Sequence, residues 1–158
     1  MVRKLMIVAV PAAVIVLSPP ASAQQTGGTA DEARAMLMKA LAAVKADEAK
    51  ALEMFNKGEG GFRDRDLYVF CANVNDGTIV ATGNRNLKEA LGTDIRAAQN
   101  STGERFGAEM YAAIQKPEGQ ITEVSYMFPR PGADKTPVPK VSYVTRVGDL
   151  GCGVGYYK

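Results

Sequence analysis

The sequence predicts an α+β domain in which a long N-terminal helix precedes five strands. Apolar residues repeat at helical spacing from Leu37 to Val44 and again from Leu52 to Phe55, which predicts one long helix. From Leu67 the period changes to that of strands, and turn residues join several of the strand-like runs directly. We therefore expect the order helix, two strands, two helices and three strands.

The first 23 residues have the pattern of a secretory signal peptide: a basic start, an apolar stretch over residues 5–17 and a small-residue cleavage site ending at Ala23. A membrane anchor is the alternative, but the apolar stretch is shorter than the roughly 20 residues that cross a bilayer. We therefore expect a periplasmic or secreted protein, in which residues 24–29 form a flexible tether and residues 30–158 form one domain.

The expected helices have recognisable boundaries. Thr29 and Glu32 form a capping box at the start of the long helix, and Asp47 is a place for a bend. The sequence NKGEGG stops this helix. After the first two strands we expect a short helix around residues 87–91 and a longer one that is opened by Ser101 and ends before Pro117.

The strand-like runs differ in how they are covered. LYVFCANV, which starts at Leu67, is apolar on both faces, as expected of a central strand, and an Asn-Asp-Gly turn returns the chain into TIVAT to form a hairpin. The later runs ITEVSYMF and KVSYVTRV alternate in polarity and are separated by the proline-rich loop PRPGADKTPVPK.

The ending GDLGCGVGYYK is rich in glycine, which raises the question of a nucleotide-binding loop. That reading requires a helix directly after the glycines, and the chain stops instead. In a strand, Gly151, Gly153 and Gly155 share one face, so this face is bare backbone. We expect another part of the molecule to pack closely against it.

Composition excludes several classes of function. The chain has no histidine, which excludes Ser-His-Asp and Cys-His catalysis, histidine metal sites and covalent c-type haem attachment. The chain has 19 basic and 17 acidic residues. Once Arg3 and Lys4 are removed with the expected signal peptide, the two kinds of charge balance, so the composition implies no attraction to nucleic acid. We expect no metal, no cofactor and no catalytic group.

Three segments of the sequence resemble those of a known family. DLYVFCANVNDGTIVATGN, PKVSYVTRV and GVGYYK, in this order after a long helix, resemble a single Cache domain, the extracytoplasmic relative of PAS sensors. The resemblance covers about residues 30–158 and implies a five-stranded antiparallel PAS/Cache-like sheet in the order 2-1-5-4-3, with the long helix on one face and a small-molecule pocket on the other. Such domains often belong to membrane receptors; we expect this chain to be a stand-alone form.

Cys71 and Cys152 are expected to form a disulfide. An even pair of cysteines in an exported protein is typical of one, although two buried free thiols are the alternative. In the strand order that the resemblance implies, the two residues lie on adjacent central strands, near enough to bond.

The candidate ligand-binding residues are Tyr126, Phe128, Lys140 and Tyr143. If their two strands pair on the same side, Tyr126 and Tyr143 converge, and Lys140 adds a positive charge at the rim. The alternatives are core packing for the aromatic residues and a solvated edge charge for Lys140. Two phenols and one ammonium group suit a small carboxylate.

We therefore expect a binding module that captures a small organic acid and either buffers it or presents it to a membrane receptor. The alternative is a structural or interaction protein that forms a homodimer through its N-terminal helix, as Cache-like sensors often do. An enzyme ranks third, because carboxylates such as Glu59, Asp64 and Asp66 show no spacing that suits paired acid and base catalysis.

Overall fold

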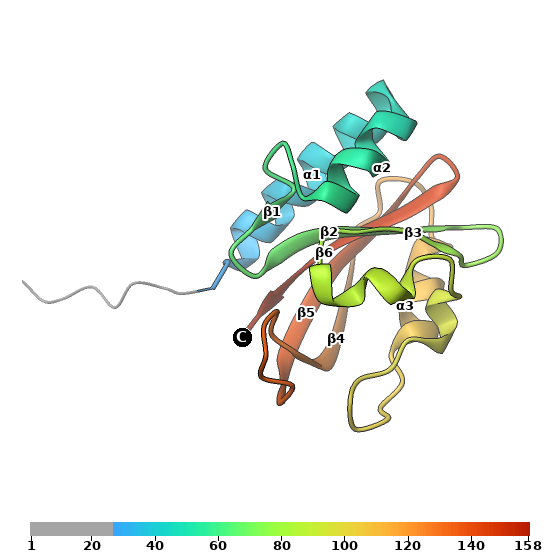
Figure 1. The fold of residues 1–158 in the computed structure, drawn as a ribbon. Helices are drawn as coiled ribbons and strands as arrows, with labels where there is room; N and C mark the ends of the chain where they lie inside the picture. The colour runs from blue at the N-terminus through green and yellow to red at the C-terminus, as the bar shows by residue number, and fades with distance from the viewer. Residues whose placement is uncertain (1–26) are drawn as a thin grey trace, which may run out of the picture.

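The computed structural model describes residues 27–158, so the predicted signal peptide lies outside the described part of the chain. An antiparallel sheet forms the centre of the domain. Helices α1 (Ala30–Ala46) and α2 (Glu48–Lys57) cover one face of the sheet, and α3 (Gly107–Ile114) lies on the other (Figure 1). The prediction of an α+β fold with a long N-terminal helix is confirmed.

The two N-terminal helices are separated where the sequence predicts a bend. The expected capping box is present at the start of α1, and hydrogen bonds from Arg65 and Thr29 lower the pKa of Glu32 to about 2. Asp47 has an extended backbone, and its side chain caps the first turn of α2. Gly58, with a φ of 70°, then ends α2 in the left-handed conformation that glycine adopts without strain.

The sheet has the predicted strand order. Every pairing is antiparallel, and the five main strands follow the order β3-β2-β6-β5-β4, which is the order 2-1-5-4-3 when the strands are counted along the chain. A short strand, β1 (Arg63–Asp64), also pairs with β2. The main strands are β2 (Leu67–Asn73), β3 (Ile79–Thr82), β4 (Thr122–Pro129), β5 (Pro137–Val147) and β6 (Leu150–Tyr157).

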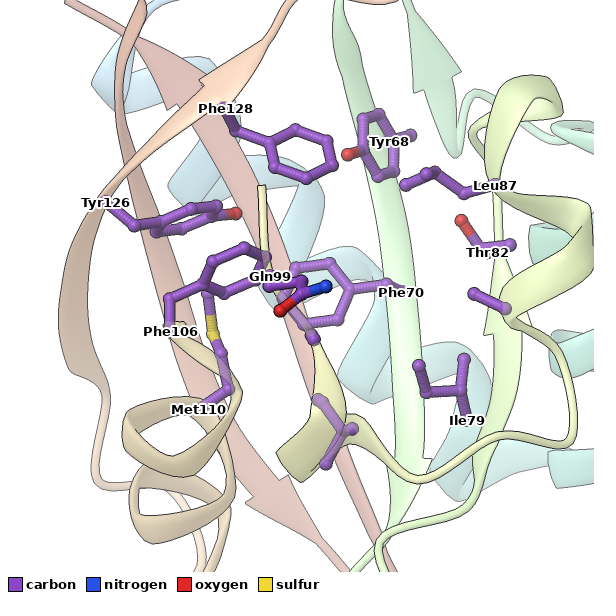
Figure 2. Close-up of a pocket in the computed structure, with 13 residues that line it drawn as sticks. Tyr68, Phe70, Ile79, Thr82, Leu87, Gln99, Phe106, Met110, Tyr126 and Phe128 are labelled. Carbon is purple, nitrogen blue, oxygen red and sulfur yellow. The ribbon is translucent and has the colours of Figure 1, made fainter. Parts of the chain in front are cut away.

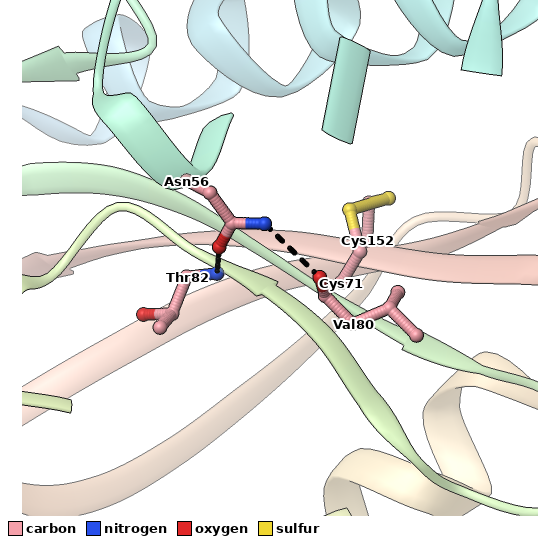
Figure 3. The surroundings of a disulfide bond; sticks show 5 residues. All are labelled: Asn56, Cys71, Val80, Thr82 and Cys152. Atoms are coloured by element: carbon pink, nitrogen blue, oxygen red, sulfur yellow. Dashed lines mark hydrogen bonds between the residues drawn. A yellow bond between two sulfur atoms is a disulfide. The ribbon is translucent and has the colours of Figure 1, made fainter. Parts of the chain in front are cut away.

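The predicted disulfide is confirmed. Cys71 of β2 and Cys152 of β6 lie opposite each other in the two central strands, bonded and fully buried on the face that α1 and α2 cover (Figure 3). Nearby, Asn56 at the end of α2 donates to Val80 O and accepts from Thr82 N, which ties the helix to β3 (Figure 3). The disulfide thus joins two neighbouring strands of the sheet, and the paired hydrogen bonds of Asn56 join the helical layer to it.

The glycine face of β6 is closely packed, as predicted. A Cβ at Gly151 would lie 2.1 Å from Ile114 of α3, and one at Gly153 would lie 2.4 Å from the ring of Phe70. At Gly155 the same atom would lie 2.5 Å from the aliphatic stem of Lys140. The three glycines therefore make room for a helix and for two large side chains from the neighbouring strands.

Two local predictions are wrong. Ser101 does not open a helix: Asn100 accepts hydrogen bonds from Thr102 N and Glu104 N in a side-chain-stabilised turn, and α3 begins only at Gly107. The proline-rich segment is a loop only in part, because β5 begins at Pro137.

The expected short helix is present as a 3-10 helix, η1 (Arg85–Ala90). At the start of the described chain, the N–H of buried Gly28 donates to Asp66, which anchors this part of the expected tether.

Candidate functional site

A cavity of about 180 Å³ opens on the face of the sheet that carries α3. Its walls come from β2, β3, β4, α3 and the irregular segment 83–106, which holds η1 and a second 3-10 helix, η2 (Ile95–Ala97). The aromatic residues that line it are Tyr68, Phe70, Phe106, Tyr126 and Phe128. Figure 2 shows Tyr126 and Phe128 pointing across the cavity toward Tyr68, with Ile79 at the opposite end.

One wall of the cavity is a cluster of three aromatic rings. The ring of Phe106 lies 4.2 Å from that of Tyr126 at an interplanar angle of 22°, and Phe128 packs edge-on against both. Aromatic pairs prefer stacked or edge-to-face arrangements, so the three rings restrict one another's orientation. This wall is therefore a preformed surface for a ligand.

Lys140 lies behind the aromatic wall and is almost completely buried, with 1% of its surface exposed. Its position follows from the register of β5, since Tyr126 of β4 and Tyr157 of β6 are its two cross-strand partners. Gly155, two residues before Tyr157 on the same face, leaves the space that the lysine stem occupies. The side chain is thus held in a pocket of its own, next to the cavity.

The ammonium group of Lys140 contacts phenols and aromatic faces. Its Nζ donates to Tyr68 Oη at 2.9 Å and lies 4.4, 4.8 and 5.3 Å from the ring centroids of Tyr68, Tyr157 and Phe128. Within residues 27–158, none of the ion pairs includes Lys140. The described chain therefore gives this buried cation hydrogen-bonding and cation–π partners but no opposite charge.

The protonation states around Lys140 follow from burial and from the surrounding phenols. Burial by itself would lower the pKa of Lys140 by desolvating its charged form, but interactions with Tyr126, Tyr68 and Tyr157 favour that form, and the net effect is a raised pKa. Burial also raises the pKa of Tyr126 and of Tyr157, so both phenols are neutral at neutral pH. The ammonium group is then surrounded by dipoles rather than by anions.

The hydroxyl groups of Tyr68 and Tyr126 form the polar end of the cavity (Figure 2). Tyr126 Oη shares a hydrogen bond of 2.9 Å with Ser142 Oγ, and Tyr68 Oη accepts from Lys140. Among residues 27–158, the hydroxyl proton of Tyr68 has no acceptor, so it can be donated to a ligand. Because a cation binds the oxygen of Tyr68, the O–H of this phenol is polarised and becomes a stronger donor toward an anion.

The four candidate residues fare differently. Tyr126 and Phe128 line the cavity. Lys140 was expected as a charge at the rim of the pocket or as a solvated charge at the sheet edge. It is buried instead, because β5 has a neighbouring strand on each side. The expected convergence of Tyr126 and Tyr143 is wrong: Tyr143 lies opposite Glu123 and therefore points to the other face, where its ring lies 5.7 Å from that of Tyr156.

Sequence reasoning missed most of the cavity. Tyr68 and Phe70 belong to the run LYVFCANV, which is apolar on both faces, so nothing in their own strand marks them as ligand contacts. A signal was present in the partner strand, since Phe70 lies opposite Gly153 and so needs the glycine beside it. Tyr111 on α3 lies outside the cavity lining, because its hydroxyl group donates to Val74 O at 3.1 Å.

No group of three or more potential metal ligands occurs in residues 27–158. In the same part of the chain, no helix combines the length and the apolar character that a membrane span requires.

The comparisons with known proteins agree with the fold. Among solved structures, the chain resembles a periplasmic sensor domain of a chemotaxis protein (TM-score 0.57, 21% identity, covering 80% of this chain and 88% of that one). A methyl-accepting chemotaxis protein from Vibrio parahaemolyticus RIMD 2210633 gives a TM-score of 0.59 at 20% identity, with 80% and 86% covered. A Cache chemosensory domain described in terms of carboxylic acid recognition gives 0.57 at 21%, also with 80% and 86% covered.

No curated protein matches the chain significantly. A family model does, and it spans almost the whole of the domain: the model for single Cache domain 2 matches residues 21–157. Together with the strand order and the position of the cavity, this match identifies the chain as a member of the single Cache domain 2 family.

Proposed function

We propose that the protein is a non-catalytic, extracytoplasmic binding module that takes a small carboxylate into the cavity between β2, β4 and α3. The observation that carries this proposal is the polar end of the cavity, where the hydroxyl groups of Tyr68 and Tyr126 face the interior and Lys140 lies behind them. A carboxylate accepts hydrogen bonds from both phenols. It also places a negative charge near the ammonium group of Lys140, which has no ion-pair partner in the described chain.

Several further observations support this reading. One of the similar structures is described as a Cache domain that recognises carboxylic acids. The signal-peptide pattern and the buried disulfide both favour the periplasm or the exterior of the cell. We propose that the protein, with its ligand bound, acts as a stand-alone sensor or presents the ligand to a membrane receptor.

The test is binding of acetate and propionate to the mature protein, measured by calorimetry and as a ligand-dependent rise in melting temperature. Tyr68→Phe and Tyr126→Phe each remove one donor, so we expect each to weaken binding at least tenfold. Tyr143→Phe is the matched control, because it removes a hydroxyl from the opposite face of the sheet. If carboxylates do not bind, or if all three variants bind like the parent, the proposal is wrong.

The alternative of a homodimer formed through the N-terminal helix is tested separately. Met38 of α1 is the one large apolar side chain in residues 27–158 that is mainly exposed, with 52% of its surface accessible. Sedimentation of the protein with and without acetate distinguishes the two functions, since a tight dimer that ignores carboxylates favours the interaction role.

A further inference from the structure

We infer that the ligand is a monocarboxylate with a compact apolar body about the size of one six-membered ring, rather than a dicarboxylate, a sugar acid or an amino acid. The inference rests on the proposed function and concerns the part of the ligand that points away from its carboxylate. It follows from where the cavity carries polar groups and from how much space it offers.

Polar groups are confined to a small part of the cavity lining. Besides Tyr68 and Tyr126, only Thr82 and Gln99 are polar. The hydroxyl oxygen of Thr82 already accepts from Asn84 N, and Gln99 is exposed. No acidic or basic residue lines the cavity, so a second carboxylate or an ammonium group on the ligand would lose its hydration without gaining a partner.

The rest of the lining is apolar and only partly covered. The apolar lining includes Ile79, Leu87, Ile95 and Met110, and Phe70 and Phe106 retain some exposure. An apolar ligand body that covers these side chains gains binding free energy in proportion to the area removed from water. Only Thr82 and Gln99 offer side-chain partners for further hydroxyl groups, so a sugar acid would bury most of its hydroxyl groups unpaired.

The volume of the cavity sets the size of the apolar body. At about 180 Å³ it is slightly larger than an apolar protein cavity of about 150 Å³ that accepts benzene. A single ring or a branched chain of similar volume fits this space when its carboxylate reaches Tyr68 and Tyr126. Acetate satisfies the phenols but leaves most of the apolar lining uncovered.

The experiment compares four probes by calorimetry on the mature protein. Benzoate has the carboxylate and the ring, acetate has the carboxylate alone, and terephthalate and 4-(aminomethyl)benzoate add an anion or a cation at the far end of the ring. We expect benzoate to bind at least about 30-fold tighter than acetate, and each of the two doubly charged probes to bind at least about tenfold weaker than benzoate.

A variant pair tests where the ring lies. Ile79 is at the end of the cavity opposite Tyr126 and Phe128 (Figure 2), so Ile79→Phe fills the space that the ring requires, whereas Ile79→Val leaves it open. We expect Ile79→Phe to weaken benzoate at least about tenfold more than it weakens acetate, and Ile79→Val to change the ratio of the two affinities by less than about fivefold.

The outcomes separate this inference from the proposed function. If acetate or terephthalate binds as tightly as benzoate, or if Ile79→Phe weakens acetate and benzoate equally, the inference is overturned and carboxylate binding stands. If none of the four acids binds, the proposed function fails, and the inference fails with it.

Discussion

Replacement of Lys140 by methionine separates a binding role of this residue from a structural one. Methionine has a similar length and fills the same channel beside Gly155, but it carries no charge. If the ammonium group is there to meet an anionic ligand, the ligand-free protein gains little stability from it. We therefore expect Lys140→Met to abolish carboxylate binding without a large loss of folding stability.

The magnitude follows from the contacts of the ammonium group. The hydrogen bond to Tyr68, at 2.9 Å, contributes about 1.5–3 kcal/mol, and the nearby rings of Tyr68 and Tyr157 add a comparable amount. Desolvation of a buried ammonium opposes these gains by several kcal/mol. The two sides nearly cancel, so we expect the free energy of unfolding of the ligand-free Lys140→Met protein to stay within about 1 kcal/mol of the parent or to rise.

Tyr68→Phe provides the comparison, because it removes the hydrogen-bond acceptor and leaves the cation buried. Such a change costs about 3 kcal/mol or more, since an unpaired buried charge remains. The double variant should recover most of this loss, and a double-mutant cycle from urea unfolding measures the coupling between the two residues. The reasoning is refuted if Lys140→Met is the more destabilising of the two single variants, or if it still binds acetate like the parent.

The remaining predictions concern stability. Gly153→Val forces the ring of Phe70 to move, so we expect a loss of about 1–3 kcal/mol in urea unfolding, and an unchanged midpoint would contradict close packing. The disulfide closes a loop of 81 residues, so its reduction should lower stability by up to about 4–5 kcal/mol, and alkylation of Cys71 or Cys152 in unreduced, denatured protein would disprove the bond. Glu32 has a folded-state pKa of about 2, below its unfolded value, so its contribution is present above about pH 4.3 and is lost as pH falls toward 2. The Glu32→Gln variant should therefore lose less stability over this range than the parent, as measured by thermal unfolding at each pH.

Much of the fold could be predicted because its signals are local. The capping box at Thr29, the break at Asp47 and the hairpin between β2 and β3 each depend on a few adjacent residues. The failed predictions involve competition between local signals. At Ser101 a capping pattern was present, but the side chain of Asn100 satisfies the same backbone groups in a turn.

The site was predicted less well because it is built from residues that lie far apart in the sequence. Phe128 and Tyr126 were identified from their own strand, whereas Tyr68 is 72 residues from Lys140, the residue that binds it. The face on which Tyr143 lies depends on the register of β4 against β5, and a shift of one residue moves a side chain to the other side of the sheet. Aromatic alternation within one strand cannot fix that register.

The sequence by itself determined the fold class, the limits of the long helix and the bare glycine face of the last strand, because periodicity, caps and the lack of a Cβ are properties of neighbouring residues. The pairing of β2 with β6 brings Cys71 and Cys152 together. Only the tertiary structure decided that Lys140 is buried, since burial depends on two flanking strands and on the space left at Gly155. The cavity beside it likewise exists only once the sheet, α3 and the segment 83–106 have packed together, because each of them contributes part of its lining.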